Sequence, residues 1–282
     1  MLFLLLAILS SASMTLALRF FRDPAGNRYG IILGNYLSCV LLAALLTPRG
    51  TSLLQTSPAT LWMGLISGLF YVAALVLMQA SVHRSGAGLS SAFARLGLLV
   101  SLLVSVLWFG ERPGAAQLLG VALVLAALAL IQGGGARDPQ ARRSFWLLLL
   151  TLLCSGGADA MSKVFEQLGD PGQSTHFFFW LFLTALLLTA GLALAEGKRG
   201  GKRLLLRELA AGAAVGIPNY FSSWLLLLAL QRLPAFLAYP IYSTGTILLV
   251  LGAGALLFRE RLNRRQGIGV GLILAALVLL NL

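Results

Sequence analysis

The chain has 282 residues, of which 59% are hydrophobic and only 11% are charged, and its formal net charge is +12. Soluble domains carry about 25% charged residues, so this composition argues against a water-soluble enzyme. A helical membrane span needs about 20 apolar residues, which leaves room for roughly ten spans. The basic residues lie between the apolar runs, a pattern of loops facing anionic lipid rather than of nucleic-acid binding.

Apolar runs bounded by charged residues, Gly and Pro predict ten membrane-spanning helices. In chain order they are Leu2–Leu18, Tyr29–Thr47, Ala59–Ala80, Ala87–Phe109, Pro113–Gln132, Ser144–Phe165, Ser174–Ala195, Leu204–Leu230, Ala235–Phe258 and Arg265–Leu282. The first run lacks the basic segment of a signal peptide, so we expect it to be part of the structure. The connections are too short for a soluble domain.

The two halves of the sequence repeat each other. At an offset of 149, Glu111 and Arg112 fall on Glu260 and Arg261, and the same register continues through matching Gln, Gly, Val, Leu and Ala residues. An offset of 148 brings Gly64 and Gly68 onto Gly212 and Gly216, pairs that let helices approach closely. We therefore predict two repeats, residues 1–136 and 137–282. Because each holds five spans, the second is inverted relative to the first, as in many secondary transporters.

Lys and Arg distinguish the two sides of the predicted bundle. The loops after the odd-numbered spans hold sixteen of these residues, whereas the other side holds four, namely Arg49, Arg112, Lys163 and Arg232. The positive-inside rule then places both termini outside the cytoplasm. Orientation does not decide between import and export.

Short motifs in both halves point to one family. The run from Gly86 to Phe93, then Phe109-Gly-Glu-Arg112 and Gln117-Leu-Leu-Gly120, resembles the second part of an EamA domain of the drug/metabolite transporter superfamily. The second half repeats it in Phe258-Arg-Glu-Arg261 and Gln266-Gly-Ile-Gly269. The resemblance covers essentially the whole chain. It implies ten transmembrane helices around a central cavity and transport of small metabolites, commonly export of amino acids or drugs. It also implies termini in the cytoplasm, from which the charge pattern departs.

Two charged residues inside predicted spans are the first candidates for a substrate site. Arg95 lies in the fourth span, where it would contact a carboxylate or phosphate of the substrate; snorkelling or a structural ion pair is the alternative. Asp159 is the one carboxylate well inside a span, and Lys163 at i+4 offers it an intrahelical partner. In the related small multidrug-resistance branch a glutamate precedes the lysine by eight residues. The equivalent positions here are Ser11 and Ser155, so the usual carboxylate is absent from both halves, and proton or ion coupling would fall to Asp159, one turn later.

The eighth and ninth spans supply the other candidates. Pro218 removes a backbone donor near the centre of a span, and broken helices at mid-depth are a recurring device for binding sites. Packing or interfacial roles are the alternative for each residue, and more so for Tyr71 and for Asn35. The polar and aromatic residues that we expect to contact substrate, besides Arg95 and Asp159, are Asn219, Tyr220, Trp224, Tyr239, Tyr242, Thr244 and Tyr71.

The sequence contains no pattern for a cofactor, a metal or catalysis. Cys39 and Cys154 lie in separate apolar runs, and His83 and His176 are isolated, so neither pair predicts a metal site. Glu111 closes a short turn beside Arg112, where structural pairing is expected. Neither a phosphate-binding loop nor a hydrolase motif is present. We therefore expect no enzyme activity and no resident cofactor.

The preferred interpretation is a secondary active transporter in the cytoplasmic (inner) membrane. It would move a small amino-acid-like or amphipathic solute by alternating access. A flippase for lipids or lipid-linked sugars is the first alternative, and a non-catalytic membrane scaffold is the second. The expected partners are the solute and membrane lipids, not nucleic acid. The chain would be a monomer, or a homodimer through the Gly267-xxx-Gly271 face.

Overall fold

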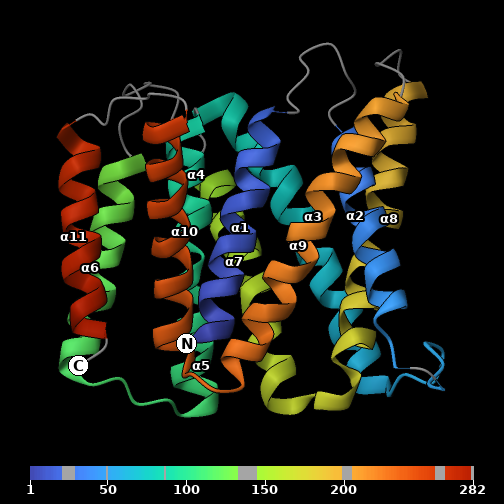
Figure 1. Cartoon of the computed structure of the whole chain (residues 1–282), viewed down its shortest axis with the longest axis horizontal. Helices are drawn as coiled ribbons and strands as arrows, with labels where there is room; N and C mark the ends of the chain where they lie inside the picture. The colour runs from blue at the N-terminus through green and yellow to red at the C-terminus, as the bar shows by residue number, and fades with distance from the viewer. Residues whose placement is uncertain are drawn as a thin grey trace. The chain divides into compact units, whose positions relative to one another are not determined.

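A computed structural model describes residues 1–20, 29–48, 50–85, 87–132, 145–198, 205–257 and 264–280. Within these ranges the regular structure is entirely helical (Figure 1). The first half contains α1 (Leu2–Phe20), α2 (Gly30–Leu45), α3 (Pro58–Ser85), α4 (Ala87–Leu96), α5 (Leu98–Phe109) and α6 (Ala115–Gln132). The second half contains α7 (Phe145–Leu168), a short 3₁₀ turn η2 (Pro171–Gln173), α8 (Ser174–Lys198), α9 (Leu206–Leu230), α10 (Ala235–Leu257) and α11 (Arg264–Leu280).

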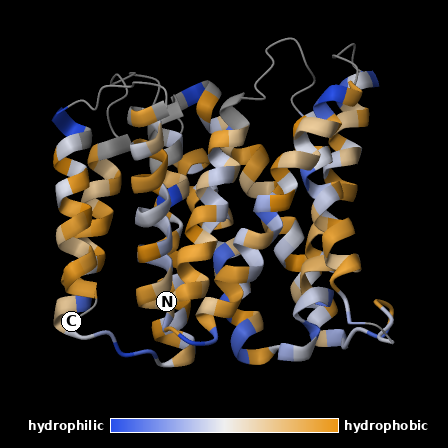
Figure 2. Ribbon diagram, viewed as in Figure 1, coloured by the Kyte–Doolittle hydropathy of each residue, from blue (hydrophilic) through white to orange (hydrophobic). Residues whose placement is uncertain are grey.

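The helices confirm the all-α membrane fold expected from the apolar runs. Among the described residues, 5 helices are long and apolar enough to cross a membrane, and five shorter apolar helices match the remaining predicted spans. Apolar residues extend along the helices, while polar residues gather near several of their ends (Figure 2). Many large apolar side chains are exposed, including Trp108 at 82% and Trp146 at 73%. Such exposure suits a bilayer, where lipid chains cover these side chains.

The fourth predicted span is interrupted, which the hydrophobic pattern does not reveal. α4 ends at Leu96 and α5 begins at Leu98, with Gly97 between them. The Gly97 N–H donates to the carbonyl of Ala94, three residues back, instead of four. A Cβ at Gly97 would lie 2.7 Å from the backbone nitrogen of Gly156 on α7. The interruption therefore lies where two helix backbones pack directly on each other.

By contrast, α9 continues through Pro218 without the break that the sequence suggested. Neighbouring side chains bond to carbonyls around the proline. Ser38 Oγ on α2 donates to the carbonyl of Ala213 at 3.0 Å, and Cys39 Sγ donates to that of Gly216 at 3.3 Å. Such contacts are how membrane helices accommodate proline.

The chain divides into two compact units, and each draws on both halves of the sequence. Unit 1 comprises Met1, Ala73–Lys163 and Ala229–Leu282. Within it α6 packs along α11, and α5 packs against α10 (Figure 1). α6 and α11 are the fifth spans of the two predicted repeats, and α5 and α10 belong to their fourth spans. A Cβ at Gly120 on α6 would lie 3.2 Å from the carbonyl oxygen of Ala276 on α11.

Unit 2 comprises Leu2–Val72 and Val164–Leu228. Within it α2 packs along α8, the second and seventh spans. The predicted small-residue pairs make the close approaches expected of them. A Cβ at Gly64 would lie 3.1 Å from the carbonyl oxygen of Phe177 on α8, and Gly212 and Gly216 on α9 contact the α2 backbone at Ile31 and Asn35. Both repeats therefore use the same glycine spacing for the same kind of crossing.

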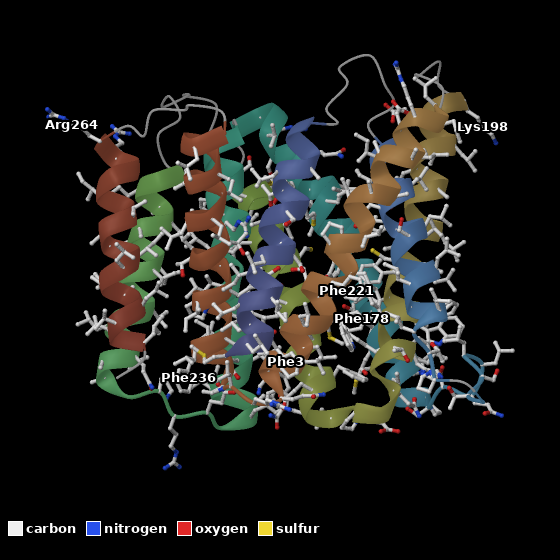
Figure 3. The ribbon with its side chains drawn as sticks, in the orientation of Figure 1. Phe3, Phe178, Lys198, Phe221, Phe236 and Arg264 are labelled. Atoms are coloured by element: carbon white, nitrogen blue, oxygen red, sulfur yellow. The ribbon has the colours of Figure 1, made fainter. Side chains whose placement is uncertain are left out.

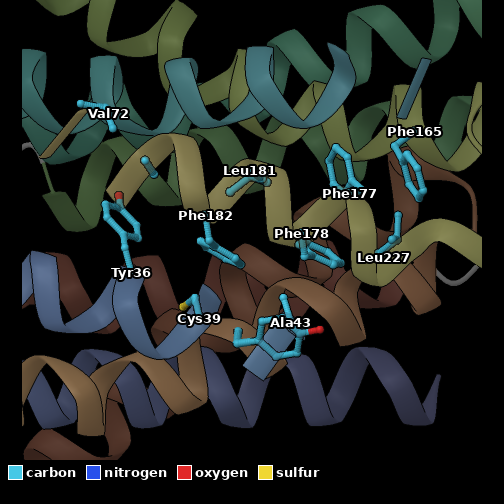
Figure 4. Close-up of a cluster of buried hydrophobic side chains, with 12 residues drawn as sticks. Tyr36, Cys39, Ala43, Val72, Phe165, Phe177, Phe178, Leu181, Phe182 and Leu227 are labelled. Carbon is cyan, nitrogen blue, oxygen red and sulfur yellow. The ribbon is translucent and has the colours of Figure 1, made fainter. Parts of the chain in front are cut away.

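An aromatic cluster fills the interior of unit 2 (Figure 4). Phe165 and Phe177 stack with ring centroids 4.4 Å apart, and Phe178 continues the row towards Phe182. Tyr36 from α2 lies against Phe182 at 6.2 Å. Large buried rings supply much of the packing energy of a core, so this cluster forms the rigid centre of the unit.

Candidate functional site

Arg95 and Asp159 lie within electrostatic range of each other inside unit 1 but do not form an ion pair. Arg95 lies in the last turn of α4, two residues before Gly97, and Asp159 lies one turn beyond Gly156, so the Gly97–Gly156 crossing brings the two within electrostatic range. Within the described part of the chain, no ion pair within 4.0 Å joins them. Both side chains are partly exposed. Two opposite charges therefore lie near each other in the helix bundle without direct contact.

Tyr239 on α10 belongs to the same neighbourhood. Its hydroxyl donates to the main-chain oxygen of Asp159 at 2.6 Å, which ties α10 to α7 at the level of the carboxylate. Tyr242 is partly exposed one turn further along α10. Thr244 is fully buried, and its hydroxyl donates to the carbonyl of Pro240 at 2.6 Å. Two predicted site residues, Asp159 and Tyr239, thus meet at the α7–α10 contact, whereas the Thr244 hydroxyl bonds within α10.

Lys163 has a partner that sequence reasoning missed. Its Nζ lies 3.0 Å from Oε1 of Glu111, with the two side chains 2% and 13% exposed. The spacing on α7 had indicated Asp159 as the partner of Lys163, and the adjacent Arg112 had indicated a partner for Glu111. The nearest usable signal was a lysine inside an apolar span, which requires some counter-charge. Its source could not be read from helical spacing.

The same carboxylate also caps α10. Glu111 follows Gly110, whose φ of 68° turns the chain at the end of α5. The Glu111 carboxylate accepts the backbone N–H of Ala235 at 2.9 Å and that of Phe236 at 3.4 Å. Burial acts to raise the pKa of Glu111, but the Ala235 hydrogen bond and the bond and charge of Lys163 outweigh it and hold that pKa below its ordinary value. One side chain therefore joins the α5–α6 turn, α7 and α10.

The remaining predicted residues lie in unit 2 and divide between two environments. Tyr220 is fully buried, edge-on to Phe178 at 5.9 Å, and its hydroxyl has no partner among the described residues. Tyr71 meets Phe182 edge-on at 6.1 Å, and Trp224 meets Phe221 at 6.3 Å. Figure 3 places the rings of Phe178 and Phe221 in this region. These three residues are therefore part of, or adjacent to, the aromatic core.

Asn219 lies in a polar cluster instead. Its Nδ2 donates to Oδ1 of Asn35 on α2 at 3.0 Å and approaches Sγ of Cys39 at 3.7 Å. Cys39 Sγ also lies 3.7 Å from Asn35 Oδ1. The sequence had marked Asn35 only as a weak candidate, because an isolated asparagine in a span is usually a packing residue. The structure makes it the direct partner of Asn219.

The remaining residues considered from the sequence are the two histidines, Glu260 and the glycines of α11. His176 is buried at the start of α8, where its Nε2 lies 3.3 Å from the carbonyl oxygen of Ser52. The side chain of His83 and the whole of Glu260 lie outside the described residues. Gly267 and Gly271 face open space on α11, so dimerisation through them stays a prediction.

The ten apolar helices of the described residues and the sequence duplication define a polytopic membrane protein. The chain belongs to the EamA-like transporter family, whose model matches residues 1–133 and 142–282. It is therefore a multi-pass membrane transporter of the drug/metabolite transporter type. No curated protein matches the sequence. A solved structure described only as "Crystal structure of protein" is similar over 99% of this chain and 94% of its own, with 19% identity and a TM-score of 0.78. That likeness shows the fold.

Proposed function

We propose that the protein is a secondary active transporter that moves a small amphipathic or zwitterionic solute, such as an amino acid, by alternating access. The observation that carries the proposal is the open pair of Arg95 and Asp159. A charge in a membrane interior is costly unless it faces a partner, water or a ligand. A solute with a carboxylate and an ammonium group would provide an opposite charge for each of the two side chains.

The surroundings of the pair support a binding role over a purely structural one. A structural ion pair closes to direct contact, as Lys163 and Glu111 do at 3.0 Å in the same unit. Arg95 and Asp159 are held instead by the backbone, through the Gly97–Gly156 crossing and the Tyr239 hydrogen bond. Preorganised groups that do not satisfy each other bind a ligand at low ordering cost.

Removing either charge should weaken ligand binding while the protein stays folded. We expect Arg95→Ala and Asp159→Asn each to weaken binding of the solute by about tenfold or more, equivalent to at least about 1.4 kcal/mol. A thermal-shift screen of detergent-purified protein against amino acids, amines, nucleobases, cationic drugs and lipid head groups finds the solute, because a bound ligand raises the apparent Tm. Arg84→Ala, at an exposed arginine, is the matched control. Unchanged transport in both site variants would contradict the proposal.

We also propose that the protein lies in the cytoplasmic (inner) membrane with both termini outside the cytoplasm. Sixteen basic residues lie on one side and four on the other. One of those four, Lys163, is buried against Glu111. Lys and Arg near span ends govern orientation most strongly.

A cysteine at the exposed end of α8 tests this orientation. Gly197 faces open space beside Lys198, whose side chain projects from the end of α8 (Figure 3). We expect Gly197→Cys to resist an impermeant thiol reagent in intact cells, and Thr51→Cys in the exposed α2–α3 loop to react. The wild-type protein reports the background from its own two cysteines. The reverse labelling pattern would place both termini inside.

A further inference from the structure

The crossing of α2 and α9 in unit 2 carries an amide pair whose hydrogen-bonding capacity is only half used. Asn219 Nδ2 donates to Asn35 Oδ1 at 3.0 Å. Within the described part of the chain, neither the Asn35 amide nitrogen nor the Asn219 amide oxygen has a partner. Asn35 is buried, with 8% of its surface exposed, and Asn219 is partly exposed. Whichever way each amide is turned, one bond between two amides leaves one donor and one acceptor.

The equivalent crossing of α3 with α8 shows that the amides are not needed for packing. Gly68 on α3 contacts the carbonyl of Leu181 and the side chain of Thr184, just as Gly216 on α9 contacts the carbonyl of Asn35 and the side chain of Ser38. Leu181 therefore occupies the place of Asn35. At the offset of 148, Tyr71 occupies the place of Asn219. The same helix contact thus forms in the first repeat without either amide.

The hydroxyl groups, in contrast, are common to both crossings. Ser38 Oγ lies 3.1 Å from the carbonyl oxygen of Gly34, and Thr184 Oγ1 lies 2.8 Å from that of Trp180, each four residues back. Ser38 and Cys39 also bond to the α9 carbonyls near Pro218. The structural needs of the crossing are therefore met by glycine, serine and cysteine. The amide pair is therefore not required by the crossing. Inside a membrane span, amide groups without hydrogen-bond partners are energetically costly, and such groups usually indicate a functional site.

We propose that Asn35 and Asn219 form, within unit 2, a binding site for a transported molecule that presents a carbonyl and an N–H side by side. An amide, a lactam and the edge of a nucleobase share this chemistry. The carbonyl would accept from the Asn35 amide nitrogen, and the N–H would donate to the Asn219 amide oxygen. The inference rests on the proposed transport function, since it names a chemical group of the solute.

Pairs of compounds that differ only in the N–H test the inference on the wild-type protein. 2-Pyrrolidone and uracil are expected to raise the apparent Tm, while N-methyl-2-pyrrolidone and 1,3-dimethyluracil are not. A response to the lactam alone assigns an amide, and a response to uracil alone assigns a nucleobase edge; each supports the inference. Equal shifts from the methylated compounds, or no shift from any of the four, would overturn it.

Variants then locate the binding. Asn35→Leu and Asn219→Leu, similar in size to the native residues, are expected to bind the responding compound about 3- to 10-fold more weakly, the range of one lost hydrogen bond. Ser38→Ala, which alters the same crossing but not the amides, is expected to retain the response. Asn219→Ala replaces either leucine variant that does not fold. A retained response in the asparagine variants would overturn the inference.

The outcome is separable from that of the proposed function. If the protein does not distinguish the N–H compounds from their methylated forms, but its transport is intact and is lost in Arg95→Ala, only this inference is overturned. Discrimination that depends on the asparagines, with transport unchanged in Arg95→Ala and Asp159→Asn, removes the charge-pair proposal and keeps the amide site.

Discussion

Replacing Lys163 with methionine is expected to lower the free energy of unfolding by about 3–5 kcal/mol, because it leaves the Glu111 carboxylate half-buried without its counter-charge. The lysine is 2% exposed, and its Nζ lies 3.0 Å from the carboxylate. Methionine keeps the length and apolar character of the side chain. Denaturant unfolding in mixed micelles, or the apparent Tm, measures the loss.

The double variant Lys163→Met with Glu111→Gln separates the ion pair from the packing. Because glutamine still accepts the Ala235 N–H and carries no charge, the double variant should recover part of the lost stability. A double variant no more stable than Lys163→Met would show that the loss came from packing rather than charge. A stable Lys163→Met single variant would contradict the buried pair altogether.

Acidification gives an independent check on this prediction. The pKa of Glu111 in the folded protein lies below its ordinary value of 4.5. Its contribution is therefore complete above that ordinary value and is lost as the pH falls through the lowered one. Between about pH 5 and pH 3 the wild type should lose more stability than the Glu111→Gln protein. An equal loss in the two proteins would assign the acid sensitivity to other groups.

The second large effect is expected from adding one methyl group at the helix crossings of unit 2. Alanine at Gly212 would drive its Cβ into the backbone carbonyl of Ile31, and alanine at Gly34 would meet the carbonyl of Leu209. Neither obstacle is a flexible side-chain end, so the helices must separate. Overpacking of this kind costs about 1–3 kcal/mol or more. We expect a lower apparent Tm and poor recovery of folded protein.

Gly191 on α8 is the matched control, because nothing lies within 4 Å of a Cβ built there. Gly191→Ala should raise stability by up to about 1 kcal/mol, since alanine favours the helix over glycine. The same chemical change is therefore expected to have opposite signs at Gly191 and at Gly212. Equal effects at the two positions would contradict the backbone-to-backbone packing.

The sequence was a good guide to features that a single helix controls. The predicted ends of the spans lie within a few residues of the observed ones, as for Ser174–Ala195 against Ser174–Lys198. Lipid demands about 20 apolar residues per span, and this length constraint is written locally in the chain. The glycine pairs of the two repeats were also identified correctly, because spacing on one helix face suffices to show a packing surface.

Contacts between distant segments could not be predicted from the sequence pattern of a single helix. The break at Gly97 arises because the Gly156 backbone approaches it. The partner of Lys163 comes from a turn 52 positions earlier, and the partner of Asn219 from α2, 184 positions earlier. Helical periodicity describes which side chains share a face, but not which other face meets them.

The amino-acid sequence by itself determined the membrane class, the ten spans and the duplication, because each follows from local hydrophobicity or from comparison of the chain with itself. The family followed from the resemblance of its motifs to those of EamA domains. Only the tertiary structure decided which polar groups satisfy one another and which do not. Lys163 closes onto Glu111, while Arg95 and Asp159 stay apart and the Asn35–Asn219 pair keeps a donor and an acceptor. The physical reason is that hydrogen bonds and ion pairs in a bilayer act over about 3–4 Å, and such distances are set by helix crossings rather than by residue order.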